Sequence, residues 1–409
     1  MDKKLRNYAD YIVKAAINAV LPDEAVKRAL EGQDFPGRVF LVSVGKAGWQ
    51  MAKAAYDLMG ERITDGIVVT KYHHIKEPIE NCHCYEAGHP VPDENSFLGT
   101  EAVLNMVSNL SATDTVLFLL SGGGSALFEK PLVPGEVLQN VTNQLLGCGA
   151  DIVEINTIRK RLSAVKGGRF AEHCAPAKVF SVVLSDIVGD PLDMIASGPA
   201  CADSSTCEQA VAIAEKYQLN LTTETWELLR KETPKELSNV TTQITGSVRQ
   251  LCKAAEAACQ ALGFETIVLT DTLSCEARDA GKCLAGHLMT SDRRNVAFIA
   301  GGETVVKLTG KGLGGRNQEL ALSAAEIISG ADGAAVFSVG SDGTDGPTDA
   351  AGGYVDYETS ELLKSQGILI SEVLADNDAY HALQAVDGLI MTGPTGTNVN
   401  DVAVALLIS

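Results

Sequence analysis

The chain has 409 residues, 45% of them hydrophobic and 21% charged, which is the composition of a globular protein long enough for two domains with separate cores. These values exclude a disulfide-stapled miniprotein and an intrinsically disordered chain. The formal net charge of −19 repels phosphate backbones and anionic membrane surfaces. We therefore expect neither nucleic acid nor a membrane among its partners.

The amino terminus is charged and lacks the apolar core of a signal peptide. No stretch reaches the roughly 18 consecutive apolar residues that a membrane span needs. The 10 cysteines are scattered, without a Cys-x-x-Cys pair. We expect a cytoplasmic protein whose thiols are reduced.

In chain order, the helical spacing of apolar residues first predicts helices over 5–20 and 22–29. Short apolar runs follow, each ending in a glycine or polar turn, and we interpret them as strands: 39–44, 66–70, 115–120 and 179–184. Because helical patterns separate these runs, the strands should be parallel and covered by helices on both faces. The first domain is thus expected to be α/β, with a doubly wound parallel sheet.

The polar stretch 231–245 interrupts this alternation and is the best candidate for the crossing between two domains, 1–237 and 238–409. The elements expected beyond it are helices over 248–262 and up to 289, strands over 266–269, 296–300, 304–308 and 334–339, and a helix from Gly314 onward. Strands 296–300 and 304–308 flank two glycines as a bent or hairpin pair, so the second sheet should be mixed. The last apolar segment, 402–408, is a candidate to pack back on the first domain.

Ligands of open α/β sheets bind beyond the carboxyl ends of the strands. At one such end the sequence Ser121-Gly122-Gly123-Gly124-Ser125 leaves the backbone open to a ligand, which favours a cradle for phosphate or carboxylate. The alternative is a strained turn that needs positive φ. Ser125 is a poor candidate for a hydrolase nucleophile, because Leu127 stands where Gly-x-Ser-x-Gly requires glycine.

Two cations accompany glycine-rich turns. Lys46 lies in Gly45-Lys46-Ala47-Gly48 at the end of the first strand, where a phosphate ligand and an ordinary surface position are equally good explanations. The surrounding sequence does not match a Walker loop. Arg316 follows the loop 310–315 at the start of an expected helix, and a flexible loop that could close over a ligand favours a functional role.

Two acidic loops also follow strand ends, and they carry the aspartates Asp186, Asp190 and Asp193, and Asp342, Asp345 and Asp349. Oxygen-only ligands suit Mg²⁺, which needs few carboxylates because it keeps bound water. Aspartate next to glycine is equally an ordinary turn former. Magnesium ligation and simple turn formation therefore both remain open.

One segment contains residue types that bind zinc: His73, His74, Cys82, His83, Cys84 and His89. Its spacing matches no known zinc site, and we expect packing instead. The dinucleotide fingerprint Gly-x-Gly-x-x-Gly is also missing, because Asn317 follows Gly312 and Gly314 where the third glycine should be. This absence disfavours a dehydrogenase.

Taken together, these stretches resemble the glycerate 2-kinase family of bacteria and archaea, which has an amino-terminal Rossmann-like domain and a carboxyl-terminal domain called the multi-organism fragment with rich leucine. The similar motifs occur in the family's order over nearly the whole chain, at 44–48, 88–93, 121–125, 162–169, 185–199, 301–304, 314–319 and 340–351. The resemblance implies that the chain transfers the γ-phosphoryl group of ATP to the 2-hydroxyl of D-glycerate, with Mg²⁺, in a cleft between its two domains.

The family uses a lysine and an arginine that correspond to Lys46 and Arg316. By the same resemblance, His89, Lys166 and Arg169 are candidates to bind the substrate, and Asp190 is a candidate to orient its hydroxyl. Asp186, Asp342 and Asp345 are the candidate Mg²⁺ ligands, residues 121–125 the candidate phosphate site, and a homodimer the candidate assembly.

Two alternatives remain. Relatives of this family also carry the label hydroxypyruvate reductase, and hydroxypyruvate differs from glycerate only by oxidation at carbon 2. A non-catalytic protein that binds small hydroxy acids would need the same carboxylate cradle but no metal.

Overall fold

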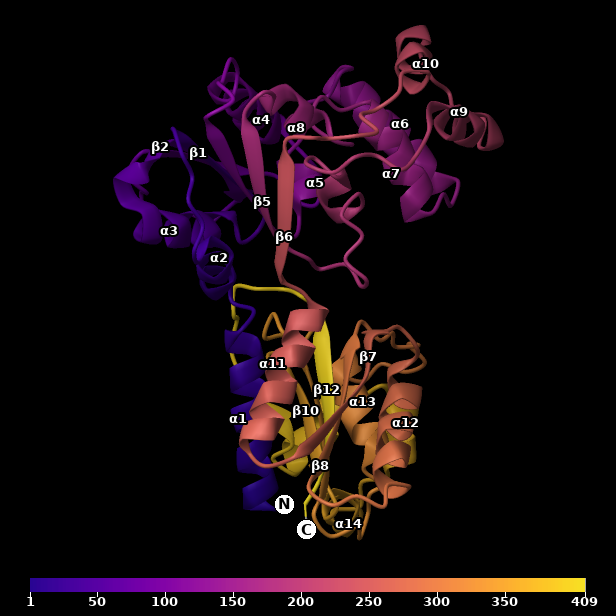
Figure 1. Ribbon diagram of the computed structural model, residues 1–409. Coiled ribbons are helices and arrows are strands. Elements are labelled where there is room, and N and C mark those ends of the chain that lie inside the picture. The colour runs from indigo at the N-terminus through magenta and orange to yellow at the C-terminus, as the bar shows by residue number, and fades with distance from the viewer. Residues whose placement is uncertain (409) are drawn as a thin grey trace. The chain divides into compact units, whose positions relative to one another are not determined.

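The computed structural model describes residues 1–408, which form two compact units, each built around a six-stranded sheet (Figure 1). The parallel-sheet unit contains residues 25–184 and 190–245. The mixed-sheet unit contains residues 1–24, 185–189 and the chain from 246 onward. The expected α/β class and the expected pair of sheets, one parallel and one mixed, are confirmed.

The parallel sheet has the spatial strand order β3-β2-β1-β4-β5-β6, which is the order of the Rossmann fold. Its strands are β1 (Val39–Val44), β2 (Ile63–Lys71), β3 (Cys82–Ala87), β4 (Thr115–Leu120), β5 (Lys178–Leu184) and β6 (Val240–Gly246). Its helices are α2 (Pro22–Leu30), α3 (Gly48–Met59), α4 (Glu94–Met106), α5 (Gly124–Leu127), α6 (Gly135–Gly147), α7 (Ile152–Arg161), α8 (Arg169–Cys174), α9 (Cys207–Lys216) and α10 (Thr223–Leu229), with 3-10 turns η1 (Gly60–Arg62) and η2 (Ile195–Ser197).

The strands β1 and β4 lie at the centre of this sheet and are buried along their full length, as their apolar sequences predict. They pair in parallel with Val44 opposite Leu120, so their carboxyl ends lie side by side. The strand order reverses between them, and this is the position where doubly wound sheets bind ligands. The turns after β1 and β4 are therefore placed at the expected binding edge.

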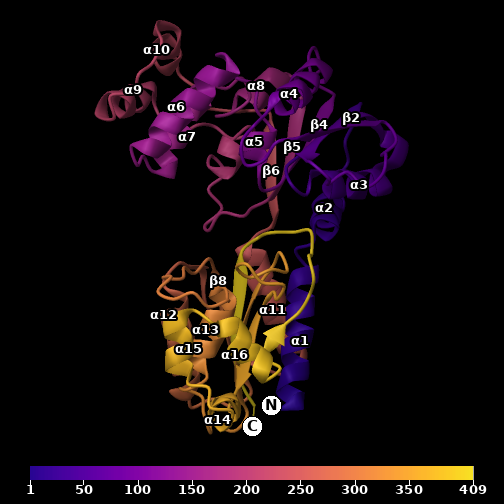
Figure 2. The ribbon, with the colours of Figure 1, turned by 180° about the vertical axis from the view of Figure 1, so that it is seen from behind.

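The mixed sheet has the order β11-β10-β9-β12-β8-β7. Its strands are β7 (Glu265–Leu273), β8 (Val296–Gly302), β9 (Ala334–Gly340), β10 (Gly352–Asp356), β11 (Leu389–Ile390) and β12 (Asp401–Leu407). Its helices are α1 (Lys3–Asn18), α11 (Val248–Ala261), α12 (Ala277–Met289), α13 (Arg316–Ala324), α14 (Thr359–Ser365), α15 (Ile370–Asp376) and α16 (Ala379–Ala385). Helices α1 and α11 pack together on one face of the sheet, and α12 and α13 pack together on the other (Figures 1 and 2).

The expected division at 237/238 differs from the division that the structure shows. Helix α1 belongs to the mixed-sheet unit, because its buried face packs against α11, β9 and β10. The polar stretch 231–245 is not simply a crossing, since β6 begins at Val240 as the partly exposed edge strand of the parallel sheet.

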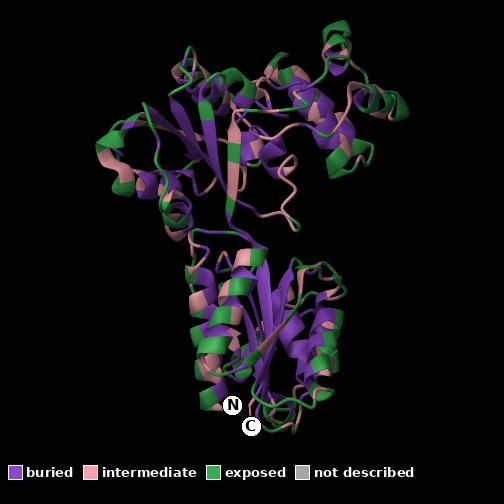
Figure 3. Ribbon diagram, viewed as in Figure 1, coloured by how far each residue is buried: buried purple, intermediate pink, exposed green. Residues whose placement is uncertain are grey.

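Two expectations about the second sheet are wrong. The last segment does not pack back on the first domain: β12 is the strand between β8 and β9, antiparallel to both and buried throughout (Figure 3). Residues 304–308 do not form a strand either, since they contribute one isolated bridge at Val305 and leave Leu308 81% exposed. The sheet is mixed because β12 and β10 run antiparallel to their neighbours while β7 and β8 are parallel, not because of a hairpin after β8.

Candidate active site

The turns after β1 and β4 are bonded to each other. The Lys46 amide donates to the Gly122 carbonyl at 2.9 Å, and the Ala47 amide donates to Ser121 Oγ at 3.1 Å. Gly45 has φ +117°, and a Cβ there would lie 2.2 Å from Ser121 Oγ and 2.5 Å from the Ser121 carbonyl oxygen. Only glycine permits this approach, so the sequence Gly45-Lys46 fixes where Lys46 lies.

The substitution Gly45→Ala is expected to lower the free energy of unfolding by roughly 2–4 kcal/mol, because it adds a clash with backbone to the strain of positive φ. Denaturant unfolding measures this. Gly32→Ala is the matched control, since Gly32 also has positive φ, +70°, but a Cβ there would meet nothing within 4 Å. If the two variants lose equal stability, the close packing of these turns is not as described.

Lys46 and His89 come together over the glycine loop 121–125. Gly123 has φ +87°, and a Cβ there would lie 2.9 Å from His89 Cδ2 and 3.2 Å from Lys46 Cγ. Any side chain at this position would therefore fill the space between the loop and the two basic residues. The structure thus joins three stretches that the sequence singled out separately: the Lys46 turn, the glycine loop and the His89 motif.

The charge around this loop is positive. Burial lowers the pKa of His89, and the nearby charges of Lys46, Lys71 and His74 lower it further. Within residues 1–408, neither Lys46 nor Lys71 forms an ion pair with a carboxylate. A chain with a net charge of −19 has carboxylates in excess, so basic residues left without one at a ligand-binding edge indicate an anionic ligand.

The segment 190–198 lies against the same loop and was only partly anticipated. Ser197 Oγ lies 3.2 Å from Ser125 Oγ and donates to Asn156 Oδ1 at 3.0 Å. Asp190, Ala196 and Ser197 have φ of 53°, 50° and 62°, values that non-glycine residues rarely adopt and that cluster at functional sites. Nothing in the sequence marks Ala196 or Ser197, because strain of this kind depends on tertiary packing.

Arg159 is a further basic residue at the loop that sequence analysis missed. Its Nη2 donates to the Ser125 carbonyl at 3.2 Å, while its buried Nε has no hydrogen-bond partner in the described part of the chain. Asp190, which the sequence did identify, has a half-buried carboxylate with no hydrogen bond or ion pair to residues 1–408.

Lys166 and Arg169 do not lie where a substrate ligand would. Lys166 is fully buried and is bonded to the carbonyls of Ser125 and Phe128. Arg169 Nη1 donates to three carbonyls around the end of α7, those of Lys160, Arg161 and Ser163. We therefore assign neither residue to substrate binding, since the Lys166 ammonium is enclosed and Arg169 Nη1 is directed at backbone carbonyls.

Arg316 lies at the start of α13 in the mixed-sheet unit, as expected. Its guanidinium donates to both oxygens of Asp401, from Nε at 2.6 Å and Nη2 at 3.1 Å, and from Nη1 to Glu303 at 2.8 Å. Burial opposes the charged form, but Asp401 and Glu303 raise the pKa of Arg316 above its ordinary value. The guanidinium is therefore always charged, and it is 32% exposed.

Sequence analysis did not identify Asp401, and it included Glu303 only as part of the motif 301–304, although both positions follow from the topology. Glu303 directly follows β8. Asp401 begins β12, and because β12 is antiparallel, its first residue pairs with Gly302 and Gly340 at the ends of β8 and β9. The start of an antiparallel strand thus lies at the same edge as the ends of its neighbours.

The carboxylate of Asp345 binds backbone amides at the start of helix α13. Its carboxylate accepts from the Asn317 and Gln318 amides at 3.1 and 2.9 Å and from Asn317 Nδ2 at 3.3 Å, and so caps α13. Burial raises the pKa of Asp345 to about 6, although these donors act in the opposite direction. The expectation of a Mg²⁺ ligand at Asp345 is therefore not supported.

Asp342 and Asp186 fit a cation site better. Asp342 is half-buried, and its Oδ1 accepts only the Thr344 amide, so lone pairs remain for a ligand. Asn400 connects the two loops, since its Nδ2 donates to the Asp186 carbonyl and its own carbonyl accepts from Ser341. Two carboxylates with water and phosphate oxygens are a usual donor set for Mg²⁺.

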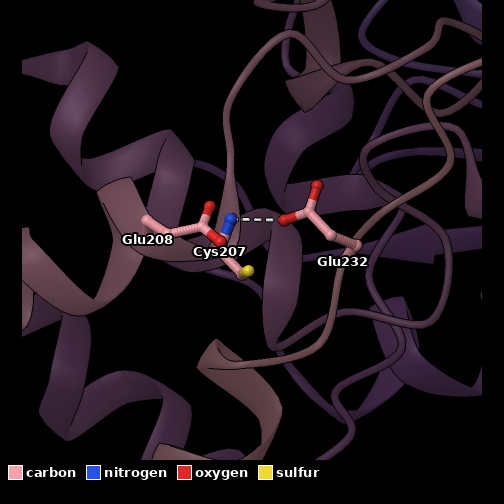
Figure 4. Close-up of side chains that lie close together, drawn as sticks. All are labelled: Cys207, Glu208 and Glu232. Atoms are coloured by element: carbon pink, nitrogen blue, oxygen red, sulfur yellow. Dashed lines mark hydrogen bonds between the residues drawn. The ribbon is translucent and has the colours of Figure 1, made fainter.

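The zinc-type residues of segment 73–89 are spread over β3, the turn before it and the loop after it, where His89 lies over the glycine loop, and His83 is exposed. The group of possible metal ligands in residues 1–408 is instead Cys207, Glu208 and Glu232 (Figure 4). Glu232 is already paired with Lys235 at 2.6 Å and Arg161 at 3.3 Å. Burial and hydrogen bonds to the two carboxylates raise the pKa of Cys207 above its ordinary value.

Comparisons with known proteins agree with this arrangement. Residues 8–230 match a domain described as a domain of unknown function, DUF4147, and residues 296–401 match the MOFRL family. The D-glycerate 2-kinase of Thermotoga maritima is 51% identical over 99% of both chains, and the glycerate 2-kinase of Pyrococcus horikoshii is 40% identical over 97% of this chain and 93% of its own. A crystal structure of Thermotoga maritima glycerate kinase superposes with a TM-score of 0.95 at 50% identity, covering 100% of both chains.

The fold and its paired domains place the chain among the two-domain α/β proteins that join a DUF4147 domain to a MOFRL domain. Within that class, it belongs to the glycerate 2-kinase family. A relative from Agrobacterium vitis, 37% identical over 91% of this chain and 100% of its own, is named a putative hydroxypyruvate reductase. None of the helices within residues 1–408 combines the length and apolar character needed to cross a bilayer.

Proposed function

We propose that this protein transfers the γ-phosphoryl group of ATP to the 2-hydroxyl of D-glycerate, giving 2-phosphoglycerate and ADP. The observation that carries the proposal is the pair of lysines without acidic partners, Lys46 after β1 and Lys71 at the end of β2, with the imidazole of His89 beside them. ATP and phosphoglycerate are anions that such a site would hold.

Phosphoryl transfer proceeds through a loose transition state whose charge lies on the equatorial phosphate oxygens, so the protein contributes mainly positioning and electrostatic stabilisation. We assign Lys46 and His89 to phosphate oxygens above the glycine loop. Arg316, a fixed and partly exposed cation, would stabilise the transferring group. The unpartnered carboxylate of Asp190 would accept a hydrogen bond from the glycerate hydroxyl and orient it for attack.

Asp342 and Asp186 are the residues that would hold Mg²⁺, the metal that the family implies. Bound there, Mg²⁺ would supply positive charge that offsets the negative charge of the phosphate oxygens.

Reduction of hydroxypyruvate is the second candidate, because relatives carry that name. It would require a nicotinamide cofactor, and the turn after β1 reads Gly45-Lys46-Ala47-Gly48, without the glycine spacing that admits a pyrophosphate in dinucleotide-binding folds. The lysine in this turn instead suits a terminal phosphate.

An initial-rate assay separates the two candidates. With Mg²⁺ and ATP, ADP formation is expected to depend on D-glycerate and to saturate with it. With NADH or NADPH and hydroxypyruvate, absorbance at the nicotinamide band is expected to stay constant. Nicotinamide oxidation without ADP formation in the first assay would reject the kinase proposal.

A further inference from the structure

Lys166 raises a question that the proposed function leaves unanswered. It is completely buried, as is Glu129, whose Oε2 lies 3.1 Å from its ammonium group. Burying such a pair is costly, and apolar side chains of similar volume often give a more stable protein. A buried ion pair next to a ligand-binding loop therefore needs an explanation other than stability.

The ammonium of Lys166 is directed at the backbone of the glycine loop. It donates to the Ser125 and Phe128 carbonyls, each at 2.9 Å. Ser125 lies in α5, which has only four residues, and Phe128 is the C-cap of this helix. A helix this short cannot hold its own geometry, because nucleating a turn costs more than its few hydrogen bonds return.

The same turn also holds the strained segment on the other side of the loop. The Gly167 and Gly168 amides donate to the Ser197 and Gly198 carbonyls at 2.9 and 2.7 Å. Ser197 in turn contacts Ser125. Lys166 and the residues after it thus tie together two segments that meet at the candidate phosphate site.

We propose that Lys166 and Glu129 form a buried clamp that keeps residues 121–128 in the geometry that binds phosphate, so that Lys166 is a positioning residue for phosphoryl transfer. The inference rests on the proposed function for its kinetic consequence. Its structural consequence, a rigid loop, is independent of any activity. Glu129 favours the charged form of the ammonium through this ion pair, and neither of its carboxylate oxygens has a hydrogen-bond partner in residues 1–408.

The charge on Lys166 is sensitive to alkaline pH. Burial lowers its pKa to about 8, Arg159 on α7 lowers it further, and Glu129 opposes the change. Because the folded pKa lies below the ordinary 10.5, the unfolded chain binds more protons between about pH 8 and 10.5, and this group's contribution to stability rises over that range. Loss of the proton should therefore weaken the clamp without unfolding the protein.

The first test is amide hydrogen exchange of residues 122–128 in the Lys166→Met variant. Protection of these amides is expected to fall about tenfold or more. Arg161→Met is the matched control, since Arg161 is equally buried, donates to the Thr157 and Ser205 carbonyls and pairs with Glu232, away from the loop. It should lower stability without changing exchange in 122–128. Unchanged protection in Lys166→Met would overturn the clamp whether or not the protein is a kinase.

The second test is kinetic. The Lys166→Met/Glu129→Leu double variant, which removes both charges of this pair, is expected to regain the thermal stability lost in Lys166→Met while kcat/KM stays about 10²-fold below the parent. The parent should lose activity above about pH 8, and Lys166→Arg, whose charge persists, should not. If the double variant recovers activity together with stability, Lys166 is structural only. If the parent phosphorylates nothing, the proposed function fails and the exchange result alone decides on the clamp.

Discussion

Arg316→Ala is expected to lower kcat by roughly 10³-fold or more, while the affinity for ATP changes far less. A cation that stabilises the transferring phosphoryl oxygens can be worth about 10³–10⁵ in rate, by analogy with arginine fingers, whereas a ground-state contact would appear in binding. Steady-state kinetics with D-glycerate and MgATP, combined with ATP binding by calorimetry, measures the two effects separately.

This variant needs a stability control, because it leaves Asp401 buried without its partner. Arg278→Ala removes another partly buried arginine of the same unit, which pairs with Glu319 on α13, and should leave kcat close to that of the parent. If Arg316→Ala remains folded and keeps kcat within tenfold, a loss of only about 1.4 kcal/mol, the catalytic role of Arg316 must be abandoned.

Lys46→Ala is expected to impair both binding and catalysis, lowering kcat/KM for ATP by roughly 10²–10³-fold. Lys46 lies over the glycine loop beside His89, where it would contact phosphate in the ground state and in the transition state alike. Lys53→Ala, on the exposed face of α3 where Lys53 pairs with Asp57, is the matched control and should behave as the parent. A Lys46→Ala enzyme with an unchanged KM and kcat would remove Lys46 from the site.

The sequence predicts the parallel sheet and the turns after its central strands well, for local reasons. The runs that become β1 and β4 are almost entirely apolar, which is typical of strands that helices cover on both faces. The glycines that follow these strands predict turns in which two stretches of backbone pack closely. Gly45 and Gly123 do adopt positive φ. Strand, turn and helix are each encoded within a few neighbouring residues, so the parallel sheet and its turns can be inferred from the sequence alone.

The remainder depends on pairing between distant segments. The last strand looks like any apolar run, and nothing near it reveals that it lies between β8 and β9 and carries Asp401 to Arg316. Lys166 looks like a substrate ligand because it is a lysine among glycines, but the fold buries it against Ser125 and Phe128. Whether a cation faces substrate or backbone is decided by tertiary packing, which local patterns do not contain.

The most direct test of the proposed activity is the position of the phosphate on the product. We expect ³¹P nuclear magnetic resonance of a reaction containing the purified protein, MgATP and D-glycerate to show 2-phosphoglycerate and ADP forming in equal amounts. The Lys46→Ala and Arg316→Ala variants should form both far more slowly. Formation of 3-phosphoglycerate, or ATP hydrolysis that yields inorganic phosphate alone, would contradict the account.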